Sequence, residues 1–163
     1  MSKVKIGILT CTNAKQDLYC PSTMCLHSLK EGKAGFAAYR EAGGAELLGL
    51  VTCDGCPSLA APERIVKRVK GLVDLGVEAI HLSSCMMAVC PYRNKYLGIL
   101  QEAFPEVSVV PGTHYDENVA PEESARAFLG MIRPMLTHVP EKTMADLAMQ
   151  LYPDLFPQKQ AVQ

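Results

Sequence analysis

A chain of 163 residues with 48% hydrophobic residues is long enough for one domain with its own core and too apolar to be disordered. Its formal net charge of −1 excludes the basic surface that nucleic acids or anionic membranes attract, so we expect neither partner. Seven cysteines, and no apolar run near the ~20 residues of a membrane span, predict a cytoplasmic protein whose reduced thiols serve metal or redox chemistry.

Short apolar runs alternate with helical patterns along the chain. The runs that predict strands are Val4 to Leu9, Ala45 to Thr52, Glu78 to Ser84 and Val107 to Val110. The patterns that predict helices begin near Ser28, Leu59 and Cys90-Pro91, with two more over about 125–136 and 141–151, while Met86 to Val89 is predicted as an apolar loop or short turn.

This alternation predicts the α/β class. We expect a single three-layer α/β/α domain around a mostly parallel four-stranded sheet, Rossmann-like or flavodoxin-like, followed by C-terminal helices. The domain is placed at residues 1–140, and a C-terminal helix and tail over residues 141–163 pack on it or trail it. The oligomeric state stays open.

The cysteines gather at the ends of the predicted strands. Cys11, Cys53 and Cys85 each follow a strand, and His114 follows the fourth strand. Right-handed crossovers bring the C-terminal ends of parallel strands to one edge, where open α/β sheets bind ligands. We therefore predict that Cys11, Cys53 and Cys85 converge in space. The other four cysteines are placed in loops or helix starts on that edge: Cys20, Cys25, Cys56 and Cys90.

The turn after the second strand reads Cys53-Asp54-Gly55-Cys56-Pro57. Proline suits the first position of a helix, and a helix start favours thiolate over thiol. A second Cys-Pro pair occurs at Cys90, so Cys56 and Cys90 are candidate reactive thiols. Asp54 is a candidate catalytic proton donor, an acceptor behind the site, or simply a turn residue.

Several other polar residues have simpler interpretations. His81 lies inside a strand and is expected to be a hydrogen-bonded core histidine rather than a ligand. His27 and His138 are expected to be ordinary polar residues outside the site. A basic group at helical spacing is expected to form a solvated helix face: Arg64, Lys67, Arg68 and Lys70.

From about Lys3 to His114, the chain resembles the CGGC domain family of small cysteine-rich proteins. The matching motifs are Ile6-Gly7-Ile8 before Cys11, Cys20-Pro21 with Cys25, Gly32 with Phe36, Cys53 to Pro57, Ile80 to Cys85, Cys90-Pro91 and Gly112-Thr113-His114. The resemblance implies metal binding, since the family has been proposed to bind zinc, and it implies no reaction. The family motif has Gly-Gly between its cysteines where this chain has Asp54-Gly55, so metal preference or proton supply can differ here.

Three functions stay open. The first is a metal-binding protein, with zinc or an iron–sulfur cluster held by thiolates and imidazole. Soft thiolate ligands also suit copper(I), and seven cysteines exceed the needs of one zinc ion. The candidate ligands are Cys11, Cys20, Cys25, Cys53, Cys56, Cys85, Cys90 and His114.

The second function is a thiol-redox or thiol-transfer enzyme that uses Cys53 with Cys56 and Cys85 with Cys90. Cys56 and Cys90 would be the nucleophiles, and their partners would resolve a mixed disulfide. The third is a structural or interaction domain. This function is the least favoured, because it does not explain why so many thiols lie at one edge of the sheet. The chain lacks a thioredoxin-like flank, a Cys-x5-Arg phosphate loop and a dinucleotide fingerprint, so whether it is an enzyme stays open.

Overall fold

The computed structural model describes residues 2–56, 60–115, 118–119, 123–124, 126–127, 130 and 149. Its strands are β1 (Val4–Thr10), β2 (Ala45–Thr52), β3 (Ala79–Leu82) and β4 (Ser108–Pro111). Its helices are α1 (Thr12–Gln16), α2 (Thr23–Glu31), the 3₁₀-helix η1 (Ala34–Tyr39), α3 (Ala61–Val73), α4 (Ser84–Val89) and α5 (Arg93–Ala103). Several predictions lie outside the described residues. They are His138, the boundary at residue 140, and all but a few residues of the helices expected over 125–136 and 141–151.

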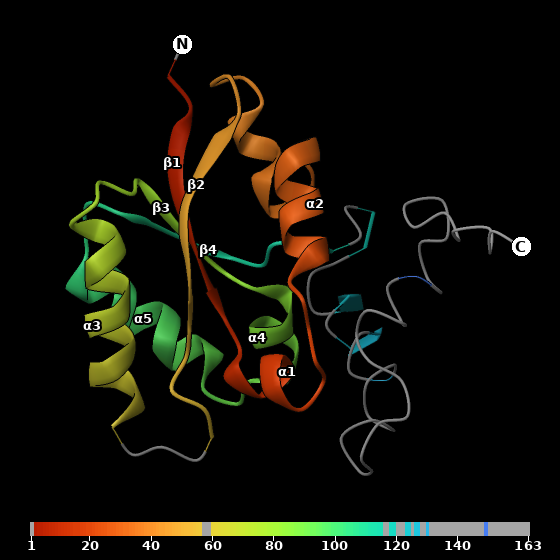
Figure 1. Cartoon of the computed structure of the whole chain (residues 1–163), viewed down its shortest axis with the longest axis vertical. Helices are drawn as coiled ribbons and strands as arrows, with labels where there is room; N and C mark the ends of the chain where they lie inside the picture. The colour runs from red at the N-terminus through yellow and green to blue at the C-terminus, as the bar shows by residue number, and fades with distance from the viewer. Residues whose placement is uncertain are drawn as a thin grey trace, which may run out of the picture.

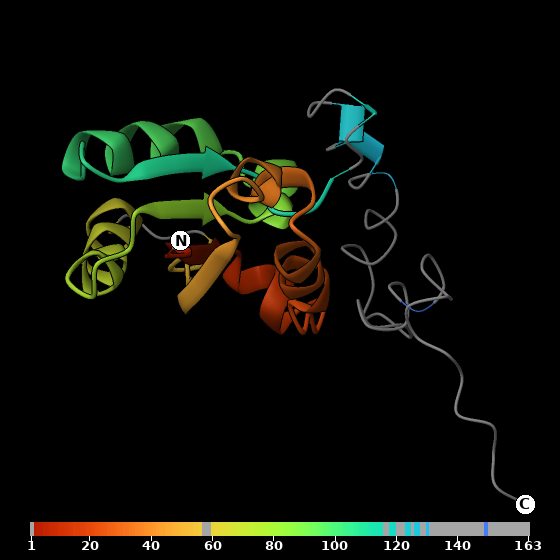
Figure 2. The same cartoon turned by 90° about the horizontal axis from the view of Figure 1, so that it is seen from above.

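The four strands form one parallel sheet in the order β2-β1-β3-β4. Figure 2 shows the arrows of β3 and β4 side by side and pointing the same way. The predicted α/β class and parallel sheet are therefore confirmed, and the fold is that of a single Rossmann-like or flavodoxin-like domain. The chain runs from β1 to β2 on one side and then crosses back past β1 to place β3 and β4 on the other side, so the switch point of the sheet lies between the C-terminal ends of β1 and β3.

Helices cover both faces of the sheet. Along β1, Ile6 and Ile8 face α2 and η1, whereas Leu9 packs with the buried residues of α3 and α5. Figure 1 shows the sheet nearly edge-on, with α3 and α5 on one side and α2 on the other. This three-layer arrangement leaves the C-terminal edge of the sheet to α1, α4 and the turn after β2. Among the described residues, no helix has the length and apolar character needed to cross a bilayer.

The β1–β2 ladder contains a shift of one residue. Ile6 pairs with Leu47, but the next residue, Gly7, pairs with Gly49. Leu72 of α3 packs over both glycines, because a Cβ atom on either one would lie 2.6 Å from a Leu72 methyl carbon. The two glycines therefore make room for a leucine that holds α3 on the sheet.

The structure corrects the predicted start of the second helix. Ser22, with a left-handed φ of 62°, precedes α2, and Gly32, with φ of 60°, ends it, so the helix begins well before Ser28. Cys25, expected in a loop, consequently lies on this helix and is buried. Phe36 belongs to the separate η1.

Two predicted helix starts are also wrong. Residues 86–89, expected as a loop, belong to α4, and Cys90 is the residue that ends this helix. The next helix begins only at Arg93. α3 begins at Ala61 with Pro62 in its first turn, rather than at the Pro57 that follows Cys56. Neither Cys-Pro pair therefore places its cysteine directly at a helix start.

The packing of Leu72 against Gly49 predicts that adding one methyl group at position 49 destabilises the fold. Gly49→Ala should lower the free energy of unfolding by about 1–3 kcal/mol, because the added methyl overlaps the Leu72 side chain. In a Leu72→Ala background the same substitution should cost little, as a double-mutant cycle from urea denaturation would reveal. Gly71→Ala is the matched control: Gly71 has open space around it on α3, so alanine should stabilise by about 0.5–1 kcal/mol. An equal cost of Gly49→Ala in both backgrounds would contradict this account.

Candidate functional site

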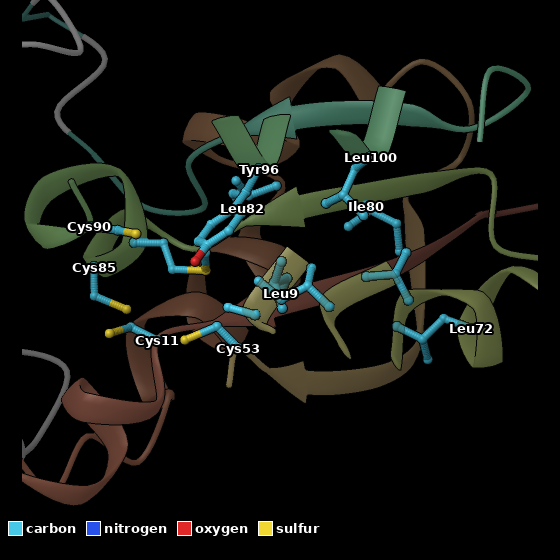
Figure 3. Packing of buried hydrophobic residues seen from close by; sticks show 14 of the residues in the cluster. Leu9, Cys11, Cys53, Leu72, Ile80, Leu82, Cys85, Cys90, Tyr96 and Leu100 are labelled. Carbon is cyan, nitrogen blue, oxygen red and sulfur yellow. The ribbon is translucent and has the colours of Figure 1, made fainter. Parts of the chain in front are cut away.

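Three cysteines meet at the C-terminal edge of the sheet. Cys11 follows β1, Cys53 follows β2, and Cys85 lies in the first turn of α4 after β3. Each is 7% exposed and belongs to the same buried cluster. Figure 3 shows their sulfurs gathered in one small region at the strand ends. The convergence predicted from the strand-end rule is observed.

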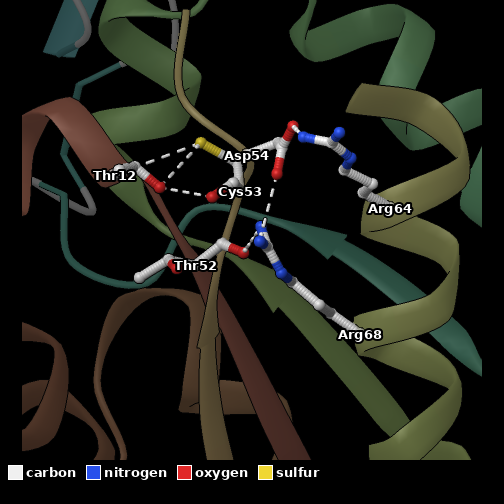
Figure 4. Close-up of polar contacts among 6 residues, drawn as sticks. All are labelled: Thr12, Thr52, Cys53, Asp54, Arg64 and Arg68. Atoms are coloured by element: carbon white, nitrogen blue, oxygen red, sulfur yellow. Dashed lines mark hydrogen bonds and ion pairs between the residues drawn. The ribbon is translucent and has the colours of Figure 1, made fainter. Parts of the chain in front are cut away.

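Cys11 and Cys53 form a hydrogen-bonded pair of sulfurs. The hydrogen bond from the Cys11 thiol lowers the pKa of Cys53 well below its ordinary value. Burial opposes this shift, and the backbone N–H groups of Thr12 and Gly55 add to it. The Thr12 N–H donates to Cys53 Sγ at 3.3 Å (Figure 4). The same hydrogen bond raises the pKa of Cys11, with burial adding to it. Cys53 is therefore the thiolate of the pair and Cys11 holds the proton.

Cys85 completes this cluster as a neutral thiol. Burial raises its pKa, while its hydrogen bond with Ser83, 3.0 Å from Oγ to Sγ, and the Cys11 backbone N–H oppose that shift. Cys20 is half-buried, packs against the same cluster, and raises the Cys85 pKa further through its charge. Among the three converging cysteines, Cys53 is thus the thiolate, and Cys11 and Cys85 are thiols.

A second group joins α2 to the segment after β4. Cys25 Sγ lies 3.4 Å from Thr113 Oγ1 and 3.6 Å from His114 Nδ1. Burial raises the pKa of Cys25 to about 12 and lowers the pKa of His114 to about 4, so both are neutral near pH 7. Ser84 Oγ receives the backbone N–H groups of Thr113 and His114 and thereby holds this segment against α4.

His81 is the hydrogen-bonded core residue that its strand position predicts. It is fully buried, with Nε2 2.8 Å from the Tyr39 hydroxyl and Nδ1 3.2 Å from the Gly112 carbonyl. Burial lowers the pKa of His81 to about 4 and raises that of Tyr39 to about 12. Nδ1–H therefore donates to Gly112 and Nε2 accepts from Tyr39, so the ring holds η1 against the strand ends and leaves no nitrogen for a metal.

A family model for the CGGC domain matches residues 5–114, which include all seven cysteines and His114. This chain belongs to the CGGC domain family. It is also 32% identical over 119 residues to the uncharacterized protein MJ0582 of Methanocaldococcus jannaschii, an alignment that covers 68% of this chain and 87% of that protein. No solved structure matches the chain.

The remaining cysteines of this CGGC domain differ in environment. Cys56 is exposed, whereas Cys90 is buried and its pKa is raised, first by burial. The expectation that Cys90 has a low pKa is therefore wrong, since it ends α4 instead of opening a helix. Cys53, expected to be a metal ligand or the sulfur that resolves a mixed disulfide, is the sulfur with the lowered pKa. Sequence spacing missed this because one of its donors, the Thr12 N–H, comes from beyond another strand.

Asp54 holds the turn of residues 53–56 against α3. Its carboxylate is 6% exposed and contacts Arg64 at 2.7 Å and Arg68 at 3.1 Å. Arg68 also donates to the Thr52 carbonyl at 3.1 Å (Figure 4). The basic face of α3 is thus not simply solvated, as expected from its spacing, because two of its arginines bind this carboxylate. At the position where the family motif has glycine, this chain has Asp54, whose two ion pairs bind the turn to α3.

The side chains at this edge are of the type that binds a soft metal ion, but they are not arranged around a metal position. Sulfur ligands prefer zinc, copper(I) and iron–sulfur clusters, and one sulfur here is already a thiolate. Among the described residues, no three Cys, His, Asp or Glu side chains stand in a ready-made metal-binding group. Binding therefore requires side-chain rotation and loss of the protons on Cys11 and Cys85.

The pKa difference between two equally buried sulfurs predicts selective alkylation. At about pH 6, where an ordinary thiol is almost wholly protonated, Cys53 should react with iodoacetamide many-fold faster than Cys85. The comparison is matched for access, since both residues are 7% exposed. Cys11→Ala removes the thiol donor and should slow Cys53 several-fold, which peptide mass spectrometry resolves site by site. Equal labelling of Cys53 and Cys85 would contradict the assignment.

The ion pairs of Asp54 predict how firmly the turn is held. Asp54→Ala should accelerate amide hydrogen exchange across residues 53–56 several-fold, because both guanidinium contacts disappear. The double variant Arg64→Ala/Arg68→Ala should produce the same acceleration without changing the turn itself. Lys67→Ala, at an exposed position of the same helix, is the control and should leave exchange unchanged. Exchange that stays slow in both test variants would mean that other contacts hold the turn.

Proposed function

We propose that this CGGC domain binds a soft metal ion through cysteine thiolates at the C-terminal edge of its sheet. The observation that supports this most is the meeting of three buried sulfurs from three strand ends, one of them with a lowered pKa. Cys11, Cys53 and Cys85 are the proposed central ligands. Burying several thiols together has no evident packing reason, whereas a cation that replaces their protons uses all three.

Cys20 is the proposed fourth ligand. It packs against the same buried cluster as the three central sulfurs, and its charge acts on Cys85. Four sulfurs give the tetrahedral donor set of a structural zinc site, and the same number holds an iron–sulfur cluster. Zinc is the simpler occupant, because it needs neither sulfide nor a redox partner.

The other predicted ligands flank this set. Cys25 of α2 and His114 form a neutral pair, and Cys56 and Cys53 lie near enough to Cys90 to act on it electrostatically. These four residues are the proposed ligands of a second metal ion or of a larger cluster: Cys25, Cys56, Cys90 and His114. Their protons would again be exchanged for metal, so binding would release protons to solvent.

Metal analysis of the full chain purified without oxygen tests the proposal. We expect a colourless protein with about one zinc ion per chain, and an iron–sulfur cluster would instead give broad visible absorption with iron and sulfide. Cys53→Ser and Cys85→Ser should each lower bound metal well below half of the wild-type level. His27→Gln is the control, because His27 lies on α2 roughly 200° around the helix from Cys25. Full metal content in both serine variants would reject the proposed ligands.

A further inference from the structure

Cys11 and Cys53 are neighbours across the β1–β2 ladder. The last register pair is Thr10 with Thr52, and Cys11 and Cys53 are the next residues on the two strands. The Cys53 N–H donates to the Thr10 carbonyl at 2.8 Å, and Cys11 keeps extended angles of φ −75° and ψ 125°. The sheet spacing therefore continues through this pair.

That spacing is the one a disulfide needs. Neighbouring strands lie about 4.8 Å apart, within the ~4.4–6.8 Å between Cα atoms that a disulfide spans. Both side chains belong to one buried cluster, and their sulfurs point toward a common region (Figure 3). The Thr12 N–H donates to Cys53 Sγ at 3.3 Å and holds this sulfur beside the end of β1.

We propose that Cys11 and Cys53 form a reversible disulfide, so that the chain is a dithiol–disulfide couple for small-molecule disulfides. The Cys53–Cys56 pair that the motif suggests is less suited, because Cys53 faces β1 from a buried position while Cys56 is exposed. The proposal goes beyond metal binding and does not depend on it.

The exchange takes two balanced steps. The Cys53 thiolate attacks a disulfide RS–SR, forms a Cys53–SR bond and releases RS⁻. Cys11 then attacks the Cys53 sulfur, the Cys11–Cys53 bond forms, the second RS⁻ leaves, and the Cys11 proton converts one leaving thiolate to thiol. The protein loses two electrons to RS–SR, and the reverse sequence reduces the protein disulfide.

The small exposed surface of Cys11 and Cys53 limits the size of the disulfide that can react with them. Cys11 and Cys53 are each 7% exposed, so they are reachable at the sheet edge without being open to a large surface. A small, flexible peptide disulfide such as oxidised glutathione can approach one sulfur at a time. A folded protein disulfide would need the turn of residues 53–56 to move away.

Redox equilibration with disulfide mapping tests the couple. The full chain, stripped of metal with a chelator and then freed of reductant, is incubated with oxidised and reduced glutathione and quenched with an alkylating agent. We expect a Cys11–Cys53 link, with free thiols falling from seven to five because one disulfide consumes two. Trypsin combined with cleavage before Asp54 separates Cys53 from Cys56, so the bonded sulfur is identified directly.

Two variants make the outcome decisive. Cys11→Ser should trap a glutathione adduct on Cys53, because the resolving sulfur is gone, whereas Cys56→Ser should still form the Cys11–Cys53 link. A wild-type disulfide mapped to Cys53–Cys56 or Cys11–Cys85, or a persistent glutathione adduct, would overturn the proposal. If the Cys11–Cys53 disulfide forms but the purified chain contains no metal, only the metal-binding proposal is rejected. If the purified chain contains metal but the Cys11–Cys53 disulfide does not form, only the dithiol–disulfide proposal is rejected.

Discussion

The one-residue shift in the β1–β2 ladder is the constraint on which the thiol pair depends. Before the shift, Val4 faces Ala45, and that register continued to the strand end would place Cys11 opposite Thr52. After the shift, Thr10 faces Thr52 and Cys11 is opposite Cys53. A slip of one residue moves every later side chain of a strand to the other face of the sheet. The shift therefore decides whether the two sulfurs meet.

The packing on the sheet stabilises this register. The shift falls at Gly7 and Gly49, and Leu72 of α3 lies over both. Bulges of this kind bend a strand and recur next to functional sites. A hydrophobic contact in the middle of the sheet thus controls the position of Cys53 at its edge, while Asp54 ties the following turn to the same helix through Arg64 and Arg68.

Much of this arrangement follows from sequence. Apolar runs separated by helical patterns predict the parallel sheet, and the strand-end rule predicts that Cys11, Cys53 and Cys85 converge. The sequence does not decide that Cys25 is helical, because Ser22 and Ser28 are both favoured N-cap residues, and Ser22 starts α2 with αL angles and no side-chain cap hydrogen bond. It also cannot identify Cys53 as the thiolate. That property depends on donors from Cys11 and Thr12, brought together only by the β1–β2 register.

Charge explains how one cluster can serve two chemistries. In the metal-free thiol state, Cys53 carries the one negative charge of the central three sulfurs, while Cys11 and Cys85 hold protons because burying further charge is costly. A divalent cation that displaces both protons leaves three thiolates and two positive charges, so the net charge does not change. A Cys11–Cys53 disulfide removes the thiolate and leaves Cys85 as a neutral thiol. Neither state adds net charge at the three central sulfurs, but the two states compete for Cys11 and Cys53, so oxidation of the pair and metal binding exclude each other.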